Sequence, residues 1–247
     1  MGILNVTPDS FSDGGKYFDK ESAVKRVFEL IDEGADIVDI GGESTRPGAE
    51  EVSVDEELKR TIPVIEEICK SGKNIFVSID TTKPEVAEAA LSAGALIVND
   101  ISGGEFYPKI HEIVNKMKAI YVLMHTTGKP FEMQKNINYK DITGDIYLNL
   151  ISKANKLRAN GLENIIIDPG IGFGKTVENN YEILSRLNEF TSAGYPLLTG
   201  VSRKSFLRKS LNIQIEDSDT ASVIMDSFAL QKGTSIIRTH NVNCLLY

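Results

Sequence analysis

The feature that most constrains the fold is a recurring unit, in which a short apolar run is followed by an amphipathic stretch and a glycine. Most of the runs are continuously apolar, which is typical of strands buried on both faces of a parallel sheet. There are eight such runs, at residues 3–6, 36–40, 74–80, 96–100, 119–125, 164–169, 196–202 and 235–240. Strand, helix and strand in this order predict βαβ units, and eight of them indicate a parallel α/β barrel.

The stretches between the runs carry helix start and stop signals. Ser53 with Glu56, and Thr82 with Glu85, have the spacing of a capping box. Helices are expected in stretches such as 21–33, 55–70, 84–93, 179–193 and 220–232. A glycine that can close the helix in the left-handed conformation stands before the next strand at Gly34, Gly72, Gly94, Gly161, Gly194 and Gly233.

We therefore expect an α/β fold, a (β/α)8 TIM barrel, that forms a single domain over residues 1–247, with a doubly wound open sheet as the alternative. A chain of 247 residues without a linker or a shift in composition suits one barrel. The first run begins at residue 3 and the chain ends seven residues after His240. The expected barrel thus lacks an N-terminal extension and has a truncated last helix.

Composition excludes several classes of protein. The 27 Lys and Arg against 35 Asp and Glu give a net charge of −8, which argues against nucleic acid or a membrane surface as the main partner. No apolar stretch reaches the ~18 residues of a spanning helix, and the first residues lack the pattern of a signal peptide. Cys69 and Cys244 are interpreted as thiols of a reducing compartment, so we expect a cytoplasmic protein.

Polar residues end every predicted strand, and the active site of an α/β barrel lies at those ends. They are Asn5, Asp39, Asp80, Asn99, Asp100, His125, Asp168, Ser202, Arg203, Lys204, Arg238 and His240. An anion such as phosphate could be held by the cations at or just beyond strand ends, which are Arg46, Lys175, Arg203, Lys204, Arg238 and His240. Asp80, Asn99 and Asp168 offer acceptors and an amide for a flat heterocycle such as a pterin or purine.

Other motifs are weak. Residues 170–175, GIGFGK, resemble a phosphate loop only superficially, because the spacing of a Walker motif is absent. His111 falls in a helical stretch and is expected at the surface. The histidines lack zinc-site spacing, and no nucleophile elbow or cysteine–histidine pattern is present, so we expect no covalent nucleophile.

Eight segments together resemble the dihydropteroate synthases, a pterin-binding family. These segments are 2–15, 39–49, 78–91, 97–104, 123–128, 168–175, 200–206 and 238–242. The resemblance implies a transferase of folate biosynthesis that condenses 6-hydroxymethyl-7,8-dihydropterin pyrophosphate with p-aminobenzoate, giving 7,8-dihydropteroate and pyrophosphate. It also implies Mg²⁺, a homodimer and inhibition by sulfonamides.

The resemblance further implies a role for individual residues. The pterin would be bound by Asp80, Asn99, Ile101, Met124, Asp168, Phe173 and Lys204. The pyrophosphate would be bound by Asn5, which also contacts Mg²⁺, and by Thr45, Arg46, Arg238 and His240. The p-aminobenzoate pocket and its two loops would comprise Asp9, Phe11, Asp13, Thr45, Pro47 and Ser202. The residues expected to carry the catalysis are Asp80, Asp168, Lys204, Arg238 and His240.

Two alternatives share the barrel and the pterin-binding carboxylates. One is the pterin-binding domain of corrinoid methyltransferases, which transfers a methyl group from methyltetrahydrofolate, and the other is a non-catalytic pterin-binding homologue. Ser202 to Lys204, the Arg238–His240 pair and the loop at 7–15 favour the synthase. In that reaction pyrophosphate departs first and the arylamine then attacks.

Overall fold

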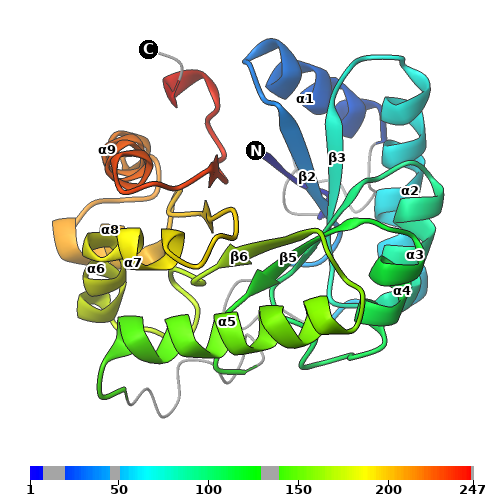
Figure 1. Ribbon diagram of the computed structural model, residues 1–247. Coiled ribbons are helices and arrows are strands. Elements are labelled where there is room, and N and C mark those ends of the chain that lie inside the picture. Colours follow the sequence, from blue (N-terminus) through cyan, green and yellow to red (C-terminus); the bar gives the residue numbers. More distant parts are fainter. Residues whose placement is uncertain (8–19, 45–50, 129–138, 246–247) are drawn as a thin grey trace.

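A computed structural model describes residues 1–7, 20–44, 51–128 and 139–245, in which strands alternate with helices along the chain (Figure 1). The strands are β1 (Gly2–Asn5), β2 (Ile37–Gly41), β3 (Phe76–Asp80), β4 (Ile97–Asp100), β5 (Ile120–Met124), β6 (Ile165–Asp168), β7 (Leu198–Thr199) and β8 (Ile236–Ile237). The helices are α1 (Lys20–Asp32), α2 (Val54–Lys70), α3 (Pro84–Ser92), α4 (Ile110–Lys116), α5 (Ile142–Ala159), α6 (Val177–Ser185), α7 (Leu187–Thr191), α8 (Ser205–Leu211) and α9 (Ser218–Gln231). A 3-10 helix, Asn243–Leu245, follows β8.

The strands close into a ring, which confirms the barrel and excludes the open sheet. β1 to β6 pair in parallel in chain order, and β7 pairs in parallel with β8. Single parallel bridges join the two sheets, one between Ile167 and Leu197 and the other between Gly2 and Thr239. At the second junction the Ile3 N–H donates to the Thr239 carbonyl, and the Thr239 N–H donates to the Met1 carbonyl, each at 3.0 Å.

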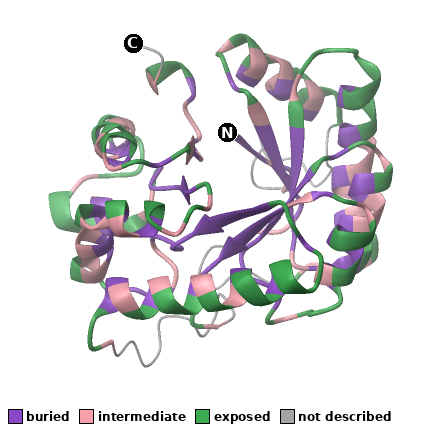
Figure 2. Cartoon of the chain, viewed as in Figure 1, coloured by how far each residue is buried: buried purple, intermediate pink, exposed green. Residues whose placement is uncertain are grey.

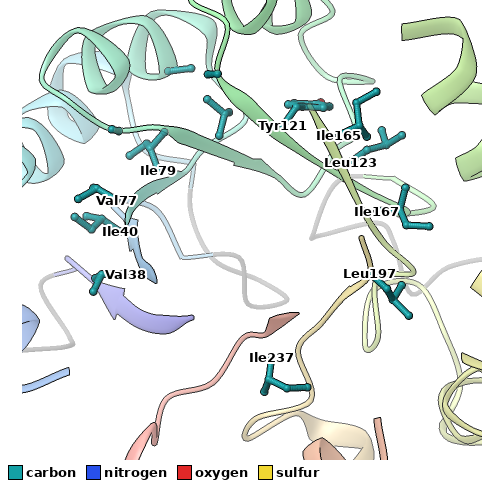
Figure 3. Packing of buried hydrophobic residues seen from close by; sticks show 14 of the residues in the cluster. Val38, Ile40, Val77, Ile79, Tyr121, Leu123, Ile165, Ile167, Leu197 and Ile237 are labelled. Atoms are coloured by element: carbon teal, nitrogen blue, oxygen red, sulfur yellow. The ribbon is translucent and has the colours of Figure 1, made fainter. Parts of the chain in front are cut away.

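The core has two layers because successive strand side chains point to opposite faces. The outer layer contains residues such as Val38, Ile79 and Leu123, which pack with the buried faces of the surrounding helices (Figure 3). The inner layer at the amino ends of the strands is formed by Met1, Ile97, Val122, Ile166 and Leu198. Figure 2 shows the strands buried and the exposed residues on the outer surfaces of the helices. The carboxyl end of the barrel interior is left for polar side chains.

The predicted glycine stops are confirmed. All six glycines have positive φ angles, between 71° at Gly72 and 114° at Gly94, as helix closure in the left-handed conformation requires. In the part of the chain that the structure describes, no helix is long and apolar enough to cross a membrane.

The helix starts are only partly as predicted. The Ser53 hydroxyl accepts a hydrogen bond from the Glu56 N–H and caps α2. The prediction for Thr82 is wrong: α3 is preceded by Lys83, which makes no side-chain cap, and begins at Pro84. A proline in this position already has a helical φ angle and lacks one of the N–H groups that a cap would satisfy.

The stretch 179–193, predicted as one helix, forms two. α6 begins after a capping box in which Thr176 and Asn179 bond reciprocally, and it ends at Ser185, with Arg186 as its C-cap. The φ and ψ angles of Arg186, −110° and 18°, leave the helical region, so that α7 starts anew. Amphipathic spacing continues across this break, which is why the pattern alone indicates a single helix.

Candidate active site

Polar side chains gather inside the carboxyl end of the barrel as a consequence of strand alternation. Asn99 follows the inner-layer residue Ile97 by two positions, and Asp168 follows Ile166 in the same way. Asp39, Asp80, Asn99 and Asp168 are all buried. Since buried carboxylates require hydrogen-bond donors or cations, their partners define the geometry of the site.

Arg238 links four strands. Its Nε donates to Oδ2 of Asp39 and its Nη2 donates to Oδ2 of Asp80, each at 2.6 Å. The Asn99 side-chain amide donates to the same Asp39 oxygen at 2.8 Å. These contacts connect β2, β3 and β4 to the residue that follows β8. The site residues are thereby held in one arrangement before any substrate binds.

The protonation of Asp80 is finely balanced. Burial raises the pKa of Asp80 to about 7; the charge of Arg238 opposes this rise, and that of Asp39 adds to it. Two carboxylates that share one guanidinium repel each other, which favours a proton on one of them. The Oδ1 atom of Asp39 is buried without a hydrogen-bond partner among the described residues.

Lys204 and Asp168 form the second half of the site. Oδ1 of Asp168 accepts from the Gly170 N–H at 2.7 Å. The Lys204 ammonium donates to the Ile171 carbonyl and lies 4.4 Å from the centroid of the Phe173 ring. Burial raises the pKa of Asp168 and lowers that of Lys204 to about 8, while their mutual attraction opposes both shifts. The structure thus brings together the predicted residues Asp168, Phe173 and Lys204.

Gly172 makes room for this lysine. Its φ angle is 85°, and a Cβ at this position would lie 2.7 Å from Cδ of Lys204. Any other residue would therefore be strained and would displace the Lys204 side chain. Gly170 is packed in the same way, since a Cβ there would lie 2.0 Å from the His125 carbonyl oxygen, and all three glycines of the 170–175 segment have positive φ angles. These glycines therefore have a structural reason that does not require a nucleotide.

Lys175 does not present a free cation, contrary to the prediction that it helps to hold an anion. Its ammonium donates to the Phe173 carbonyl at 2.7 Å and lies 3.3 Å from Nδ1 of His125. Burial lowers the pKa of Lys175 to about 7 and that of His125 to about 3. The side chain therefore joins the 170–175 segment to the end of β5.

Arg203 also departs from the predicted cation cluster. Its Nε and Nη2 donate to the two carboxylate oxygens of Asp219, at 2.8 and 3.0 Å, on α9. The φ angle of Arg203 is 57°, so the backbone turns between this residue and Lys204. Consequently Lys204 is half-buried, whereas Arg203 is exposed. Carboxylates and cations alternate at the described part of the mouth, which is therefore not a cationic patch.

The remaining predicted residues of the described chain lie around the same end of the barrel. Oγ of Ser202 and Nδ1 of His240 are 3.0 Å apart, and the His240 N–H donates to the same hydroxyl at 3.1 Å. Asn5 ends β1 in register with Gly41 of β2. Met124 ends β5 and Ile101 follows β4, both almost fully buried. Six predicted residues lie outside the described residues: Asp9, Phe11, Asp13, Thr45, Arg46 and Pro47.

Two features were missing from the predicted site. Asp39, noted only as a polar strand end, is the buried partner of Arg238, 199 residues away in sequence. Lys83, which precedes α3, is buried between Glu43 and Glu57 and donates to both carboxylates, to Glu57 at 2.5 Å. A polar residue at a strand end could have signalled Asp39, but no local pattern pairs Lys83 with residues 26 and 40 positions away.

Comparison with known proteins now identifies the family. The family model for pterin binding enzymes matches residues 1–240. Dihydropteroate synthase of Bacillus subtilis is 44% identical over 244 residues, 98% of this chain and 83% of the relative. That of Escherichia coli is 43% identical over 244 residues, 98% of this chain and 86% of the relative. The chain belongs to the dihydropteroate synthase family.

Solved structures of the family agree with the barrel. The crystal structure of Yersinia pestis dihydropteroate synthase with a sulfonamide drug superposes with a TM-score of 0.93 and 39% identity, covering 99% of this chain and 89% of that one. Xanthomonas albilineans dihydropteroate synthase with 4-aminobenzoic acid superposes with a TM-score of 0.92 and 38% identity, covering 99% and 88%. These relatives support the synthase over the methyltransferase domain and the non-catalytic homologue.

Proposed function

We propose that this chain condenses 6-hydroxymethyl-7,8-dihydropterin pyrophosphate with p-aminobenzoate to give 7,8-dihydropteroate and pyrophosphate. The observation that carries the proposal is the convergence of Asp80, Asn99 and Asp168 with Lys204 at one end of the barrel. Among the relatives, a Xanthomonas albilineans dihydropteroate synthase was solved with 7,8-dihydropteroate itself. We therefore propose that the dihydropteroate synthase reaction takes place in this chain beside the buried carboxylates of Asp80 and Asp168.

Pterin binding would use the carboxylates as acceptors. The N–H groups at the edge of the ring would donate to ionised Asp168 and Asp80, and Asn99 would supply an amide. Phe173 offers an aromatic face, and Ile101 and Met124 offer apolar surface to the flat ring. Because both carboxylates are buried, their bonds to the ring would form away from bulk water.

The diphosphate would meet Arg238 and His240. The bonds from Arg238 to Asp39 and Asp80 use Nε and Nη2, which leaves the Nη1 donors for a phosphate oxygen. His240 is positioned by Ser202. Thr45 and Arg46 would complete this part of the site.

Mg²⁺ is the metal that we propose for the reaction. Within the described residues no group of three or more His, Cys, Asp or Glu side chains is arranged to hold a metal ion. Mg²⁺ often keeps its waters and binds to substrate phosphates with only one or two protein oxygens. Asn5 at the end of β1 supplies one such oxygen, so the residues fit a metal that enters with the diphosphate. Bound there, it would neutralise charge on the leaving group.

The chemistry needs no protein nucleophile. The bond between the pterin methylene carbon and the diphosphate oxygen breaks, both electrons leave with pyrophosphate, and the cation is stabilised by the electron-rich ring near Asp80 and Asp168. The arylamine nitrogen of p-aminobenzoate then forms the C–N bond and releases a proton.

We propose that Ser202 and the loop residues Asp9, Phe11, Asp13, Thr45 and Pro47 form the pocket for p-aminobenzoate and for sulfonamides.

Two further properties belong to the proposal. We expect a cytoplasmic protein, consistent with two free cysteines. We also expect a homodimer formed through α8, α9 and the segment between them. Large apolar side chains are exposed there, with 53% exposure at Leu211 and 62% at Ile224.

The decisive assay measures pyrophosphate release and dihydropteroate formation from the pterin diphosphate. We expect pyrophosphate and dihydropteroate in equal amounts when p-aminobenzoate and Mg²⁺ are both present, and little turnover after EDTA treatment, restored by added Mg²⁺. An Asn5→Ala variant should require more Mg²⁺ for half-maximal rate. Methyl transfer from methyltetrahydrofolate to a corrinoid, without dihydropteroate formation, would overturn the proposal in favour of the methyltransferase.

A further inference from the structure

A buried hydrogen-bond network lies on the outer side of β4, opposite the pterin site. Asp100 is fully buried and accepts four hydrogen bonds. Its Oδ1 accepts from the N–H and the hydroxyl of Ser102, at 2.8 and 2.6 Å, and its Oδ2 accepts from the Gly104 N–H at 2.8 Å and the Tyr121 hydroxyl at 2.7 Å. Three of these donors belong to the turn that follows β4.

That turn has little freedom to rearrange. Gly103 and Gly104 have φ angles of 57° and 78°. A Cβ on Gly103 would lie 2.8 Å from the Met124 carbonyl oxygen, and a Cβ on Gly104 would lie 2.1 Å from the His111 ring. The turn is thus packed directly between the end of β5 and α4.

Tyr121 connects the network to α4. It is fully buried on the outer face of β5 (Figure 3). Its hydroxyl has a single hydrogen, which it donates to Asp100, so it accepts from Nε2–H of His111 at 3.1 Å. The two rings meet edge to face with centroids 5.1 Å apart. His111 is consequently half-buried, so the expectation that it lies at the surface is only partly met.

The position of Asp100 in the sequence relates this network to the pterin site. Asn99 and Ile101 flank Asp100: Asn99 bonds to Asp39 in the barrel interior, Asp100 points outward to Tyr121, and Ile101 is the first residue of the turn. We propose that Asp100 and Tyr121 are positioning residues, which hold the turn so that Asn99 and Ile101 meet the pterin ring. This inference rests on the proposed function and adds two residues to it that do not touch the substrate.

The way in which the buried Asp100 carboxylate is stabilised favours a specific role in holding the turn over a general contribution to stability. Burial raises the pKa of Asp100, while its bonds with Ser102 and Tyr121 oppose the rise. No described cation forms an ion pair with this carboxylate, so its four donors provide its local stabilisation. Removal of the Tyr121 hydroxyl would take away one of the four hydrogen bonds to Asp100, so that the turn would be held less firmly. It would also leave Nε2 of His111 without its acceptor.

The test compares Tyr121→Phe with a matched control, Tyr195→Phe. Tyr195 also loses one hydroxyl bond, to Asn155 at 2.8 Å, but it lies between α7 and β7, away from the β4 turn. We expect Tyr121→Phe to weaken binding of the pterin diphosphate about tenfold in calorimetry, with the KM for p-aminobenzoate changed less than about twofold. The control should leave both unchanged.

A second readout separates positioning from general stability. Amide hydrogen exchange at Ser102 and Gly104 should accelerate in Tyr121→Phe while protection in β1 and β2 is retained. Asp100→Asn, which places an NH2 group among N–H donors, should have the larger effect on both readouts if it folds. Unchanged pterin affinity in Tyr121→Phe, whatever its stability, would overturn the inference. Failure of the unmodified protein to bind the pterin diphosphate would instead overturn the proposed function, and exchange would still report whether Tyr121 holds the turn.

Discussion

At the scale of single residues, Arg238 determines how the site is charged. One guanidinium bonds to two buried carboxylates, Asp39 and Asp80, and can balance only one negative charge, while burial raises the pKa of Asp80 to about 7. Lys204 also changes its charge close to neutral pH, because burial lowers its pKa to about 8. An ionised Asp80 and a charged Lys204 are therefore both favoured only in the narrow pH range between about 7 and about 8.

This balance leads to an expected pH profile for kcat/KM with the pterin substrate. The rate should fall as the pH drops below about 7, because protonated Asp80 loses the negative charge that makes it a strong acceptor for the ring N–H, and it should fall again above about 8 as Lys204 loses its proton. Lys204→Arg serves as the matched variant because arginine stays charged. The activity that this variant retains should not fall above about pH 8 but persist to higher pH. A flat profile from pH 6 to 9 in the unmodified protein would contradict the assignment.

Asp226 on α9 predicts a pH-dependent stability. Both its carboxylate oxygens are buried without hydrogen-bond partners among the described residues, and burial raises its pKa from the ordinary 3.8 to about 7. The folded protein thus binds a proton more tightly than the unfolded chain, so stability is lost as the pH rises from about 4 through 7. Asp226→Asn removes this loss, which amounts to at most about 4 kcal/mol above pH 7.

Thermal unfolding at two pH values tests this expectation. Asp226→Asn should raise Tm more at pH 8 than at pH 5, whereas the exposed Asp217→Asn, at the start of the same helix, should shift Tm equally at both. A larger gain at pH 5 than at pH 8 would show that the carboxyl group is not buried in its neutral form.

At the scale of elements, local signals and long-range packing contribute differently. Apolar runs and helix-ending glycines predict all eight strands and six helix stops, because those signals act within a few residues. Thr82 was wrongly expected to cap a helix because the capping-box spacing also occurs where Pro84 already begins the helix. The pairing of Lys83 with Glu57 depends on how α2 packs beside the start of α3, which no local pattern encodes.

Loss of Lys83 should therefore destabilise the packing of α2 against α3. Glu57 is 1% exposed, and burial raises its pKa while Lys83 opposes that rise. Lys83→Met leaves this carboxylate buried without its cation, and we expect the free energy of unfolding in urea to fall by about 3–5 kcal/mol. Adding Glu57→Gln should recover part of that loss.

The exposed pair of Lys116 and Glu88 provides the control. Nζ of Lys116 and Oε1 of Glu88 are 3.3 Å apart, and the two side chains are 72% and 47% exposed, respectively. Lys116→Met should therefore lower the free energy of unfolding by less than about 1 kcal/mol. Equal losses for Lys83→Met and Lys116→Met would mean that the buried pair contributes no more than a surface one.

At the scale of the whole molecule, the sequence predicts the barrel and its functional end but not the charge pairing across it. Strand count and strand-end polarity suffice for Asp80, Asn99, Asp168 and Lys204. The contact between Asp39 and Arg238 exists only because the ring closes between β8 and β1. The predicted anion-binding cluster failed for Lys175 and Arg203 because each finds an intramolecular partner that sequence spacing does not indicate.

The proposed homodimer makes an expectation about the assembled molecule. Light scattering should give twice the 27.2 kDa mass of the chain, and Ile224→Glu on α9 should give monomers, because a charge would be buried in the apolar contact. Leu148→Glu on α5, where the side chain is 67% exposed, should leave the dimer intact. A monomeric mass for the unmodified protein would contradict the dimer while leaving the site unaffected.

The most direct test of the central claim is dihydropteroate formation by the unmodified protein and by Lys204→Ala, with circular dichroism to confirm that both are folded. The unmodified protein should form dihydropteroate from the pterin diphosphate and p-aminobenzoate. The variant should be slower by about two orders of magnitude or more, because it loses the cation that is attracted to Asp168 and lies over the ring of Phe173. Equal rates from the two folded proteins would show that the reaction does not take place at this site.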